Sequence, residues 1–214
     1  MIFKVNEIFC SLQGESVHTG LVCAFVRLTG CNLRCRYCDT RYAFYEGETM
    51  RLGHIVDKLR SFGCNLVEIT GGEPLAQEAT PVLIETLLDD GFTVLLETNG
   101  SLNIDRADRR CSRIMDIKCP SSGESESSDP TNLGRLTAID QVKYVIGDHD
   151  DFLFAVEHLA SLPDHLPAER VLFSAVSGRL PPDKLVQWMV DSRVGARFQL
   201  QLHKILWPKR ERGV

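Results

Sequence analysis

The chain has 214 residues, enough for one domain with a substantial core, and its 43% hydrophobic and 25% charged residues are typical of a soluble globular protein. The net charge of −5 argues against a nucleic-acid binder, because phosphate backbones are bound by a dense basic face. No apolar run is long enough to span a bilayer, and residues 1–9 do not resemble an export signal, so we expect no membrane partner and a cytoplasmic location.

Seven apolar runs rich in β-branched residues recur along the chain and predict strands. Several are continuously apolar, which is typical of parallel strands covered on both faces. Because the runs alternate with segments of helical spacing, we expect an α/β fold with right-handed crossovers over residues 1–214. Seven strands are too few for a closed eight-stranded barrel, so the prediction is an incomplete TIM-like barrel of parallel strands with the helices outside. The predicted strands are 22–28, 65–70, 92–98, 113–118, 140–146, 170–175 and 198–203, and the predicted helices are 51–63, 80–91, 148–163 and 181–192.

One segment, residues 120–134, interrupts this alternation. It is rich in serine, glycine, proline and acidic residues, and it predicts a long loop insertion. Two interpretations are open, a flexible surface insertion and a lid over an active site.

Three cysteines follow the first predicted strand in the segment TGCNLRCRYCDT (29–40). In a reducing compartment such a cluster indicates metal binding or catalysis. Zinc prefers four ligands, commonly two CxxC pairs, and the chain has no second CxxC. An iron–sulfur cubane held by Cys31, Cys35 and Cys38 would leave one iron open for a ligand from outside the chain. A structural zinc completed by Cys10, Cys23 or a distant histidine is the alternative.

A second motif, EITGGEPL (68–75), ends the second predicted strand. A glycine pair alone is usually a turn, but glycines also permit close approach of the backbone to a ligand. Since the carboxyl ends of parallel strands form one functional rim, this motif and the cysteines are expected at the same site.

The CxxxCxxC spacing after a strand, with GGE after the next strand, resembles the radical S-adenosylmethionine (SAM) superfamily. The resemblance implies a 4Fe-4S cluster on Cys31, Cys35 and Cys38, with SAM on the open iron. Reduction of the cluster then cleaves SAM to a 5′-deoxyadenosyl radical that abstracts hydrogen. The protein holds the cofactors and excludes water.

The superfamily match also implies the SAM contacts. An aromatic residue before the third cysteine lies beside the adenine, although packing around the cluster is the alternative for Tyr37. The GGE motif, Gly71 to Glu73 here, binds the amino group of SAM. Asp116, Lys118 and Ser174 end predicted strands, and the first two could equally be a surface charge pair. The residues assigned to SAM are Tyr37, Cys38, Asp39, Gly72, Glu73, Asp116, Lys118 and Ser174.

The segment EIFCSLQGESVHTG (7–20), with FVRLTGCNLRCRYCDT, resembles the 7-carboxy-7-deazaguanine synthases of the queuosine pathway, and so do EITGGEPL, ETNG and QLHKILWP. The resemblance covers most of the chain. It implies a lyase that converts 6-carboxy-5,6,7,8-tetrahydropterin to 7-carboxy-7-deazaguanine with loss of ammonia. A homodimer and an electron donor of the flavodoxin or ferredoxin type are further implications.

This family resemblance also assigns a substrate side. Residues 1–20 become a substrate-binding segment, and Arg27 is a natural partner for the substrate carboxylate, the alternative being a surface arginine. Thr40 is implied as a ligand of Mg²⁺, which prefers hard oxygen ligands, whereas without the family it would be a helix N-cap. The residues assigned to the substrate are Leu12, Gln13, Gly14, Glu15, Arg27, Thr70 and Pro208.

The chain departs from the family pattern at two positions in these motifs. Ser16 replaces a glycine whose backbone freedom can matter, and Tyr37 stands where tryptophan is common. Neither change removes a ligand.

Two rival functions use the same cysteines. A glycyl-radical activating enzyme has CxxxCxxC and a similar short fold, but it needs neither the LQGE segment nor the CDT threonine. A cluster- or zinc-binding interaction module leaves the GGEP segment unexplained.

Overall fold

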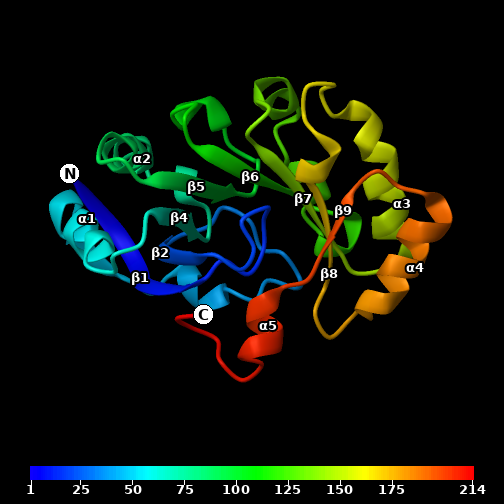
Figure 1. Ribbon diagram of the computed structural model, residues 1–214, viewed down its shortest axis with the longest axis horizontal. Coiled ribbons are helices and arrows are strands. Elements are labelled where there is room, and N and C mark those ends of the chain that lie inside the picture. The colour runs from blue at the N-terminus through cyan, green and yellow to red at the C-terminus, as the bar shows by residue number, and fades with distance from the viewer.

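The computed structural model describes all residues, 1–214, and its centre is one curved nine-stranded sheet (Figure 1). In order across the sheet, the strands are β3 (Glu48–Arg51), β1 (Ile2–Leu12), β2 (Val22–Leu28), β4 (Leu66–Gly71), β5 (Thr93–Thr98), β6 (Ser112–Ile117), β7 (Gln141–Ile146), β8 (Val171–Ala175) and β9 (Arg197–Gln199). Strand β2 and strands β4 to β9 pair in parallel. The predicted partial barrel of parallel strands is therefore confirmed.

The seven predicted strands form in place, but two strands were missed. β1 pairs antiparallel with β2, and β3 pairs antiparallel with β1 at the sheet edge. β3 is short, polar and mostly exposed, so it carries little apolar signal. The last predicted strand, 198–203, was too long, because β9 ends at Gln199 and residues 202–206 are helical.

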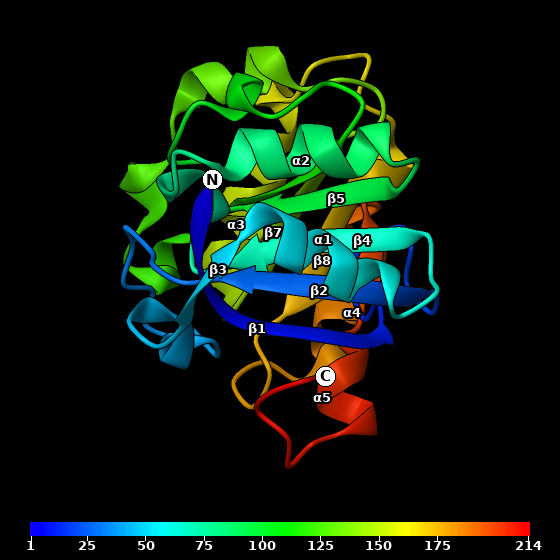
Figure 2. The same cartoon turned by 90° about the vertical axis from the view of Figure 1, so that its left-hand side faces the viewer.

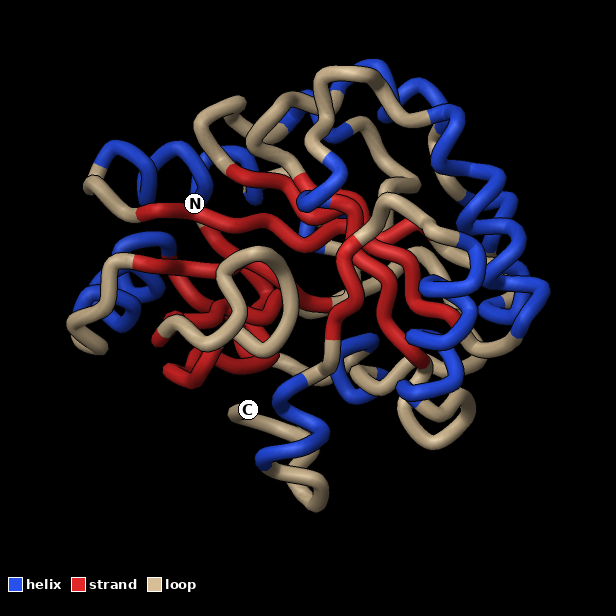
Figure 3. Tube along the Cα trace, turned by 45° about the vertical axis from the view of Figure 1, so that its right-hand side comes forward, coloured by secondary structure: helices blue, strands red, loops and turns tan.

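Four helices cover the outer face of the sheet, as predicted, and Figure 3 shows them on the convex side of the strands. Figure 2 shows α1 and α2 over one half of the sheet. Each helix buries an apolar stripe, such as Ile55, Val56 and Leu59 of α1, in a core cluster of 34 residues. None of the helices is long and apolar enough to cross a membrane. The helices are α1 (Leu52–Arg60), α2 (Thr80–Asp89), α3 (His149–His158), α4 (Pro182–Ser192) and the short C-terminal α5 (Leu202–Leu206).

The inner face of the sheet changes from apolar to charged along its strands. At the amino ends, Cys23, Phe25, Leu66, Leu95 and Ile114 form a small separate cluster. Because alternate residues of a strand share a face, the next inward positions on these strands are charged or polar residues. These positions are Arg27, Glu68, Thr70, Glu97 and Asp116. The sequence therefore places a polar compartment above an apolar floor.

The loop between β1 and β2, residues 13–20, crosses to the far strands of the sheet. The backbone N–H of Val17 donates to Gln141 Oε1 of β7 at 2.8 Å, and Gln199 Nε2 of β9 donates to Thr19 Oγ1 at 2.5 Å. Leu202 N donates to Gly14 O at 3.1 Å. This loop bridges the opening between the first and last parallel strands.

The insertion at 120–134 is folded against the cysteine loop. It contains three short 3₁₀ turns and buries Ser122 and Asn132. Ser122 O accepts the N–H of Arg36 at 2.9 Å, and Glu124 Oε1 accepts the N–H of Arg34 at 2.8 Å. The segment therefore packs against the cysteine loop, and the interpretations as a flexible surface insertion and as a lid both stay predictions.

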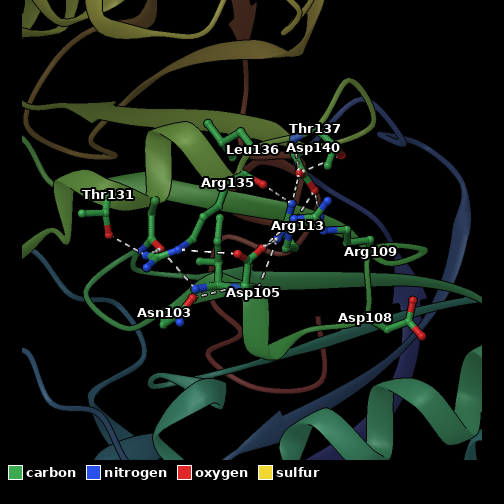
Figure 4. A network of polar contacts seen from close by, with 12 residues as sticks. Asn103, Asp105, Asp108, Arg109, Arg113, Thr131, Arg135, Leu136, Thr137 and Asp140 are labelled. Atoms are coloured by element: carbon green, nitrogen blue, oxygen red, sulfur yellow. Dashed lines mark hydrogen bonds and ion pairs between the residues drawn. The ribbon is translucent and has the colours of Figure 1, made fainter.

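A buried ion pair fastens the crossover between β6 and β7 (Figure 4). The side chains of Arg113 and Asp140 are both fully buried, and Arg113 Nη2 lies 2.5 Å from Asp140 Oδ2. Arg113 Nη1 also donates to Ile104 O at 3.3 Å, and Nη2 donates to Arg135 O at 2.8 Å. Removing one partner of such a buried pair typically costs about 3–5 kcal/mol, so the pair fixes the end of the 120–134 segment.

Candidate active site

The cysteine loop, residues 29–40, follows β2 and borders a cavity of about 680 Å³. Cys31, Cys35 and Cys38 all line the cavity, each is partly buried and each is a free thiol. Burial raises the pKa of Cys35 to about 11, so metal binding there must displace a proton. A cubane cluster takes each thiolate on a different iron, so thiols that border one cavity fit it. No group of three or more His, Cys, Asp or Glu side chains, these cysteines included, is placed to hold a single metal ion.

The glycine pair packs directly beneath the first cysteine. A Cβ at Gly72 would lie 2.3 Å from Gly30 O and 2.6 Å from Cys31 Cβ, and a Cβ at Gly71 would lie 2.3 Å from Leu28 O. Asn99 Nδ2 approaches Cys31 Sγ at 4.0 Å. Only glycine lets the two strand ends approach this closely, and this approach seats Cys31.

Glu73 is not a lining residue of the cavity. Its carboxylate is fully buried and accepts hydrogen bonds from Asn99 N at 2.7 Å, Leu75 N at 2.9 Å and the hydroxyl of Thr98 at 2.9 Å. Burial raises the pKa of Glu73, and these hydrogen bonds oppose the increase. The Glu73 side chain therefore connects the end of β4 to the end of β5 by hydrogen bonds.

The residues after Cys38 contact the C-terminal helix. Asp39 Oδ2 lies 2.7 Å from Lys204 Nζ, and Thr40 Oγ1 donates to Asp39 Oδ1 at 2.8 Å. Burial would raise the pKa of Asp39, but His203 and Lys204 hold it below its ordinary value. The Thr40 side chain makes no N-cap hydrogen bond to the short turn that follows it, so the N-cap alternative for Thr40 is wrong.

The predicted SAM residues at the strand ends separate into two groups. Tyr37 lines the cavity and donates its hydroxyl to Val145 O at 3.1 Å. Asp116 and Lys118 line the cavity as well and pair at 2.8 Å, so they are not a surface charge pair. Ser174 is fully buried, and its hydroxyl donates to Gln199 O at 2.8 Å. Ser174 therefore does not reach the cavity, whereas Val176 and Ser177 do.

Every residue that the sequence assigned to the substrate lines the same cavity: Leu12, Gln13, Gly14, Glu15, Arg27, Thr70 and Pro208. Arg27 is mostly buried, which excludes the alternative of a surface arginine. Its Nε lies 2.7 Å from Glu7 Oε1, and its guanidinium lies over the rings of Phe9 and Tyr42, at 5.8 and 5.9 Å.

Comparisons with known proteins agree with this arrangement. Residues 25–117 match the model of the radical SAM superfamily. The chain is 42% identical to the 7-carboxy-7-deazaguanine synthase of Chlorobaculum tepidum, over 99% of this chain and 97% of that protein. It is 39% identical to that of Koribacter versatilis, over 99% of this chain and all of that protein.

The chain belongs to the 7-carboxy-7-deazaguanine synthase family. In fold it is similar to the crystal structure of QueE from Escherichia coli, with a TM-score of 0.78, 22% identity and 94% of each chain covered. This likeness concerns the architecture, including the partial barrel of the radical SAM type.

The site of this family member also contains charged residues that the motifs did not reveal. Lys143 of β7 lines the cavity, with its side chain only 4% exposed. Its Nζ pairs with Glu97, lies 3.0 Å from Glu15 Oε2, and lies 3.8 Å from Asp116 Oδ2. Burial would lower the pKa of Lys143, but Glu15 and Glu97 raise it well above its ordinary value. Burial would likewise raise the pKa of Glu97, but Lys143 lowers it.

Glu68 of β4, the first residue of the EITGGEPL motif, is a second lining residue that the sequence analysis did not assign to a ligand. It lies two residues before Thr70 and shares its inward face. A signal for both residues was present in the sequence, because each is a charged residue inside an otherwise apolar predicted strand. Such a residue is seldom buried without a partner or a task.

Proposed function

We propose that this chain is a radical SAM lyase that converts 6-carboxy-5,6,7,8-tetrahydropterin to 7-carboxy-7-deazaguanine with loss of ammonia, in queuosine biosynthesis. The observation that carries the proposal is that one cavity is lined by both sets of motif residues. The cysteines and the GG motif line it together with the LQGE segment and Arg27. Membership of the synthase family supports the same reaction.

Cys31, Cys35 and Cys38 would hold a 4Fe-4S cluster with one iron open to SAM. When bound, these cofactors supply the reductive cleavage that generates the hydrogen-abstracting radical. The protein contributes the seat formed by Gly72 and the cavity that the three cysteines border.

The lining residues near the cysteines would bind SAM. Tyr37 is held by its hydrogen bond to Val145 O, which presents its ring to the cavity beside the adenine. The backbone at Gly72 and Glu73 would meet the methionine amino group, and Asp116 with Lys118 offers one anionic and one cationic group to the rest of SAM. Cys38 and Asp39 line the cavity as well and would also contact SAM.

The LQGE segment, Arg27 and Thr70 would bind the pterin. Arg27 supplies a cation for the substrate carboxylate, Glu15 accepts from the aminopyrimidine, and Thr70 contacts the ring. Lys143 holds Glu15 and Glu97 in place. The backbone of Leu12 to Gly14 and the ring of Pro208 close the edge of the pocket.

Thr40, which also lines the cavity, would hold Mg²⁺. Its hydroxyl already contacts Asp39, and Mg²⁺ combines few protein oxygens with waters and substrate oxygens. A homodimer and an electron donor of the flavodoxin or ferredoxin type complete the proposal, and both are supported by the family resemblance.

The test is anaerobic reconstitution with iron and sulfide, reduction with dithionite, and addition of SAM, Mg²⁺ and the carboxytetrahydropterin. Formation of 7-carboxy-7-deazaguanine with SAM regenerated rather than consumed is the expected result. SAM cleavage without a deazapurine product would contradict this reaction and leave only the superfamily chemistry. Absence of SAM-dependent chemistry would contradict the superfamily assignment of function.

A further inference from the structure

Glu68 is a buried acid that lines the cavity and has no positively charged partner. It is 3% exposed and lines the cavity, and no Lys, Arg or His nitrogen lies within 4.0 Å of its carboxyl group. The nearby ammonium of Lys143 is instead engaged by Glu97, Glu15 and Asp116. A buried carboxylate without a cation is strongly disfavoured relative to the neutral acid.

The hydrogen bonds of Gln13 fix where a proton on Glu68 would sit. The backbone N–H of Glu15 donates to Gln13 Oε1 at 2.5 Å, so the Nε2 end of this amide faces Glu68. Gln13 Nε2 donates to Glu68 Oε2, which is therefore an acceptor. The other oxygen, Oε1, receives no protein donor, and it is not one of the buried atoms sealed off without a partner. A proton on Oε1 therefore has access to the cavity.

The surrounding charges favour the neutral acid. Burial raises the pKa of Glu68 well above its ordinary value, Glu97 and Glu15 raise it further, and Lys143 opposes them. The thiol of Cys23, on the neighbouring strand, also faces Glu68, and burial raises its pKa too. The cations on this inner face are already paired: Arg27 of the neighbouring strand β2 with Glu7, and Lys143 with Glu15 and Glu97.

We propose that Glu68 is a substrate-reading residue that donates a hydrogen bond, as a neutral carboxylic acid, to the ring carbonyl of the pterin. The proposal rests on the proposed function and adds the donor that the acceptor Glu15 lacks. Glu15 and Glu68 together then present one acceptor and one donor to an aminopyrimidinone. A ring with an amino group in place of the carbonyl offers the wrong partner to Glu68.

Three variants of the reconstituted, SAM-loaded protein test this role. Glu68→Gln keeps a donor toward the cavity, because its amide oxygen can accept from Gln13 while its NH₂ replaces the acid proton. Glu68→Leu removes the donor at similar volume. Glu85→Gln, on the exposed face of α2, is the control for the same substitution outside the cavity.

Substrate affinity is measured by calorimetry, and product formation is measured separately with dithionite as reductant. We expect Glu68→Gln and Glu85→Gln to bind the carboxytetrahydropterin within about threefold of the wild type, and Glu68→Leu to bind it roughly tenfold more weakly. The wild type loses affinity as the pH rises through the raised pKa of Glu68, because the ionised acid cannot donate, whereas Glu68→Gln stays flat. The wild type discriminates against the 2,4-diamino analogue of the substrate, and Glu68→Leu loses most of that discrimination.

Two outcomes would overturn the role of Glu68: Glu68→Leu binding as tightly as the wild type, or Glu68→Gln binding as weakly as Glu68→Leu while its thermal unfolding is unchanged. A wild type that binds the pterin but forms no deazapurine contradicts the proposed function instead. The binding and product measurements therefore separate the two failures.

Discussion

At the scale of single residues, two backbone positions decide how the loops of the site are built. Gly72 is in contact with Cys31 and Gly30, so the cysteine loop and the GGE motif form one packed unit. Ser16 adopts a left-handed conformation with φ of 61°, on the loop that bridges the barrel opening. The family pattern has glycine there, and the structure gives the reason, because only glycine adopts this conformation without strain.

Gly72→Ala should prevent normal cluster assembly. Its Cβ would overlap backbone of Gly30 and the Cβ of Cys31, which costs about 1–3 kcal/mol and displaces the cysteine. The measurement is iron bound per chain after reconstitution in the presence of a competing chelator. Gly53→Ala is the control, since a Cβ at Gly53 in α1 meets no atom within 4 Å. Equal iron retention by the two variants would show that the contact at Gly72 is unimportant.

Ser16→Gly should stabilise the protein by about 0.5 kcal/mol, and Ser16→Val should destabilise it by at least about 1 kcal/mol. Glycine relieves the left-handed strain, although the hydrogen bond from His18 N to Ser16 Oγ at 3.1 Å is lost, and a β-branched residue adds strain. Urea denaturation of the three proteins gives the comparison. A glycine variant less stable than the valine variant would contradict this account.

At the scale of elements, the strand ends bring the site together and the 120–134 segment supports it. The segment supplies acceptors for two backbone N–H groups between the cysteines, those of Arg34 and Arg36. Its other end is fastened by the buried pair of Arg113 and Asp140. The conformation of the cysteine loop therefore depends on contacts with a distant crossover.

Glu124→Ala should loosen the cysteine loop without unfolding the domain. Loss of one charge-assisted hydrogen bond to Arg34 N, worth about 1 kcal/mol, should speed loss of iron to a chelator by roughly fivefold. Glu126→Ala is the control, because Glu126 is exposed and its side chain makes no hydrogen bond. Indistinguishable rates of iron loss from the two variants would show that the hydrogen bond between Glu124 and Arg34 does not hold the cysteine loop.

At the scale of the whole molecule, the core and the site are separate. The main core cluster of 34 residues lies between the sheet and the outer helices, whereas the three cluster cysteines border the cavity. The folding free energy from burial is therefore independent of the metal site, unlike that of a zinc finger.

The triple variant Cys31→Ser, Cys35→Ser and Cys38→Ser should fold and remain inactive. We expect far-UV circular dichroism like that of the metal-free wild type and a melting temperature within about 5 °C of it, because the three side chains contribute little to the core. Comparison with the metal-free wild type, rather than the reconstituted protein, removes the stabilisation by bound cofactors. A variant that fails to fold would place the cysteines in the core.

Much of the site was predictable because its chemistry is carried by local motifs. The spacing of Cys31, Cys35 and Cys38 after a strand, followed by GGE after the next, placed both on one rim, and the structure lines one cavity with them. The side-chain destinations of Ser174 and Glu73 were not predictable. Both residues lie at or near the ends of strands. The hydroxyl of Ser174 nevertheless bonds to Gln199 O, and the carboxylate of Glu73 accepts from Asn99 N, both inside the protein.

The sequence by itself determined the seven parallel strands and the spacing of the three cysteines, because apolar periodicity and motif spacing are local properties. Only the tertiary structure decided which charges meet inside the barrel. Lys143, Glu15, Glu97 and Asp116 come from four separate segments, and Glu68 lies near them without a cation of its own. The charge state of each buried group depends on neighbours far away in the chain, and those neighbours exist only once the sheet has curved.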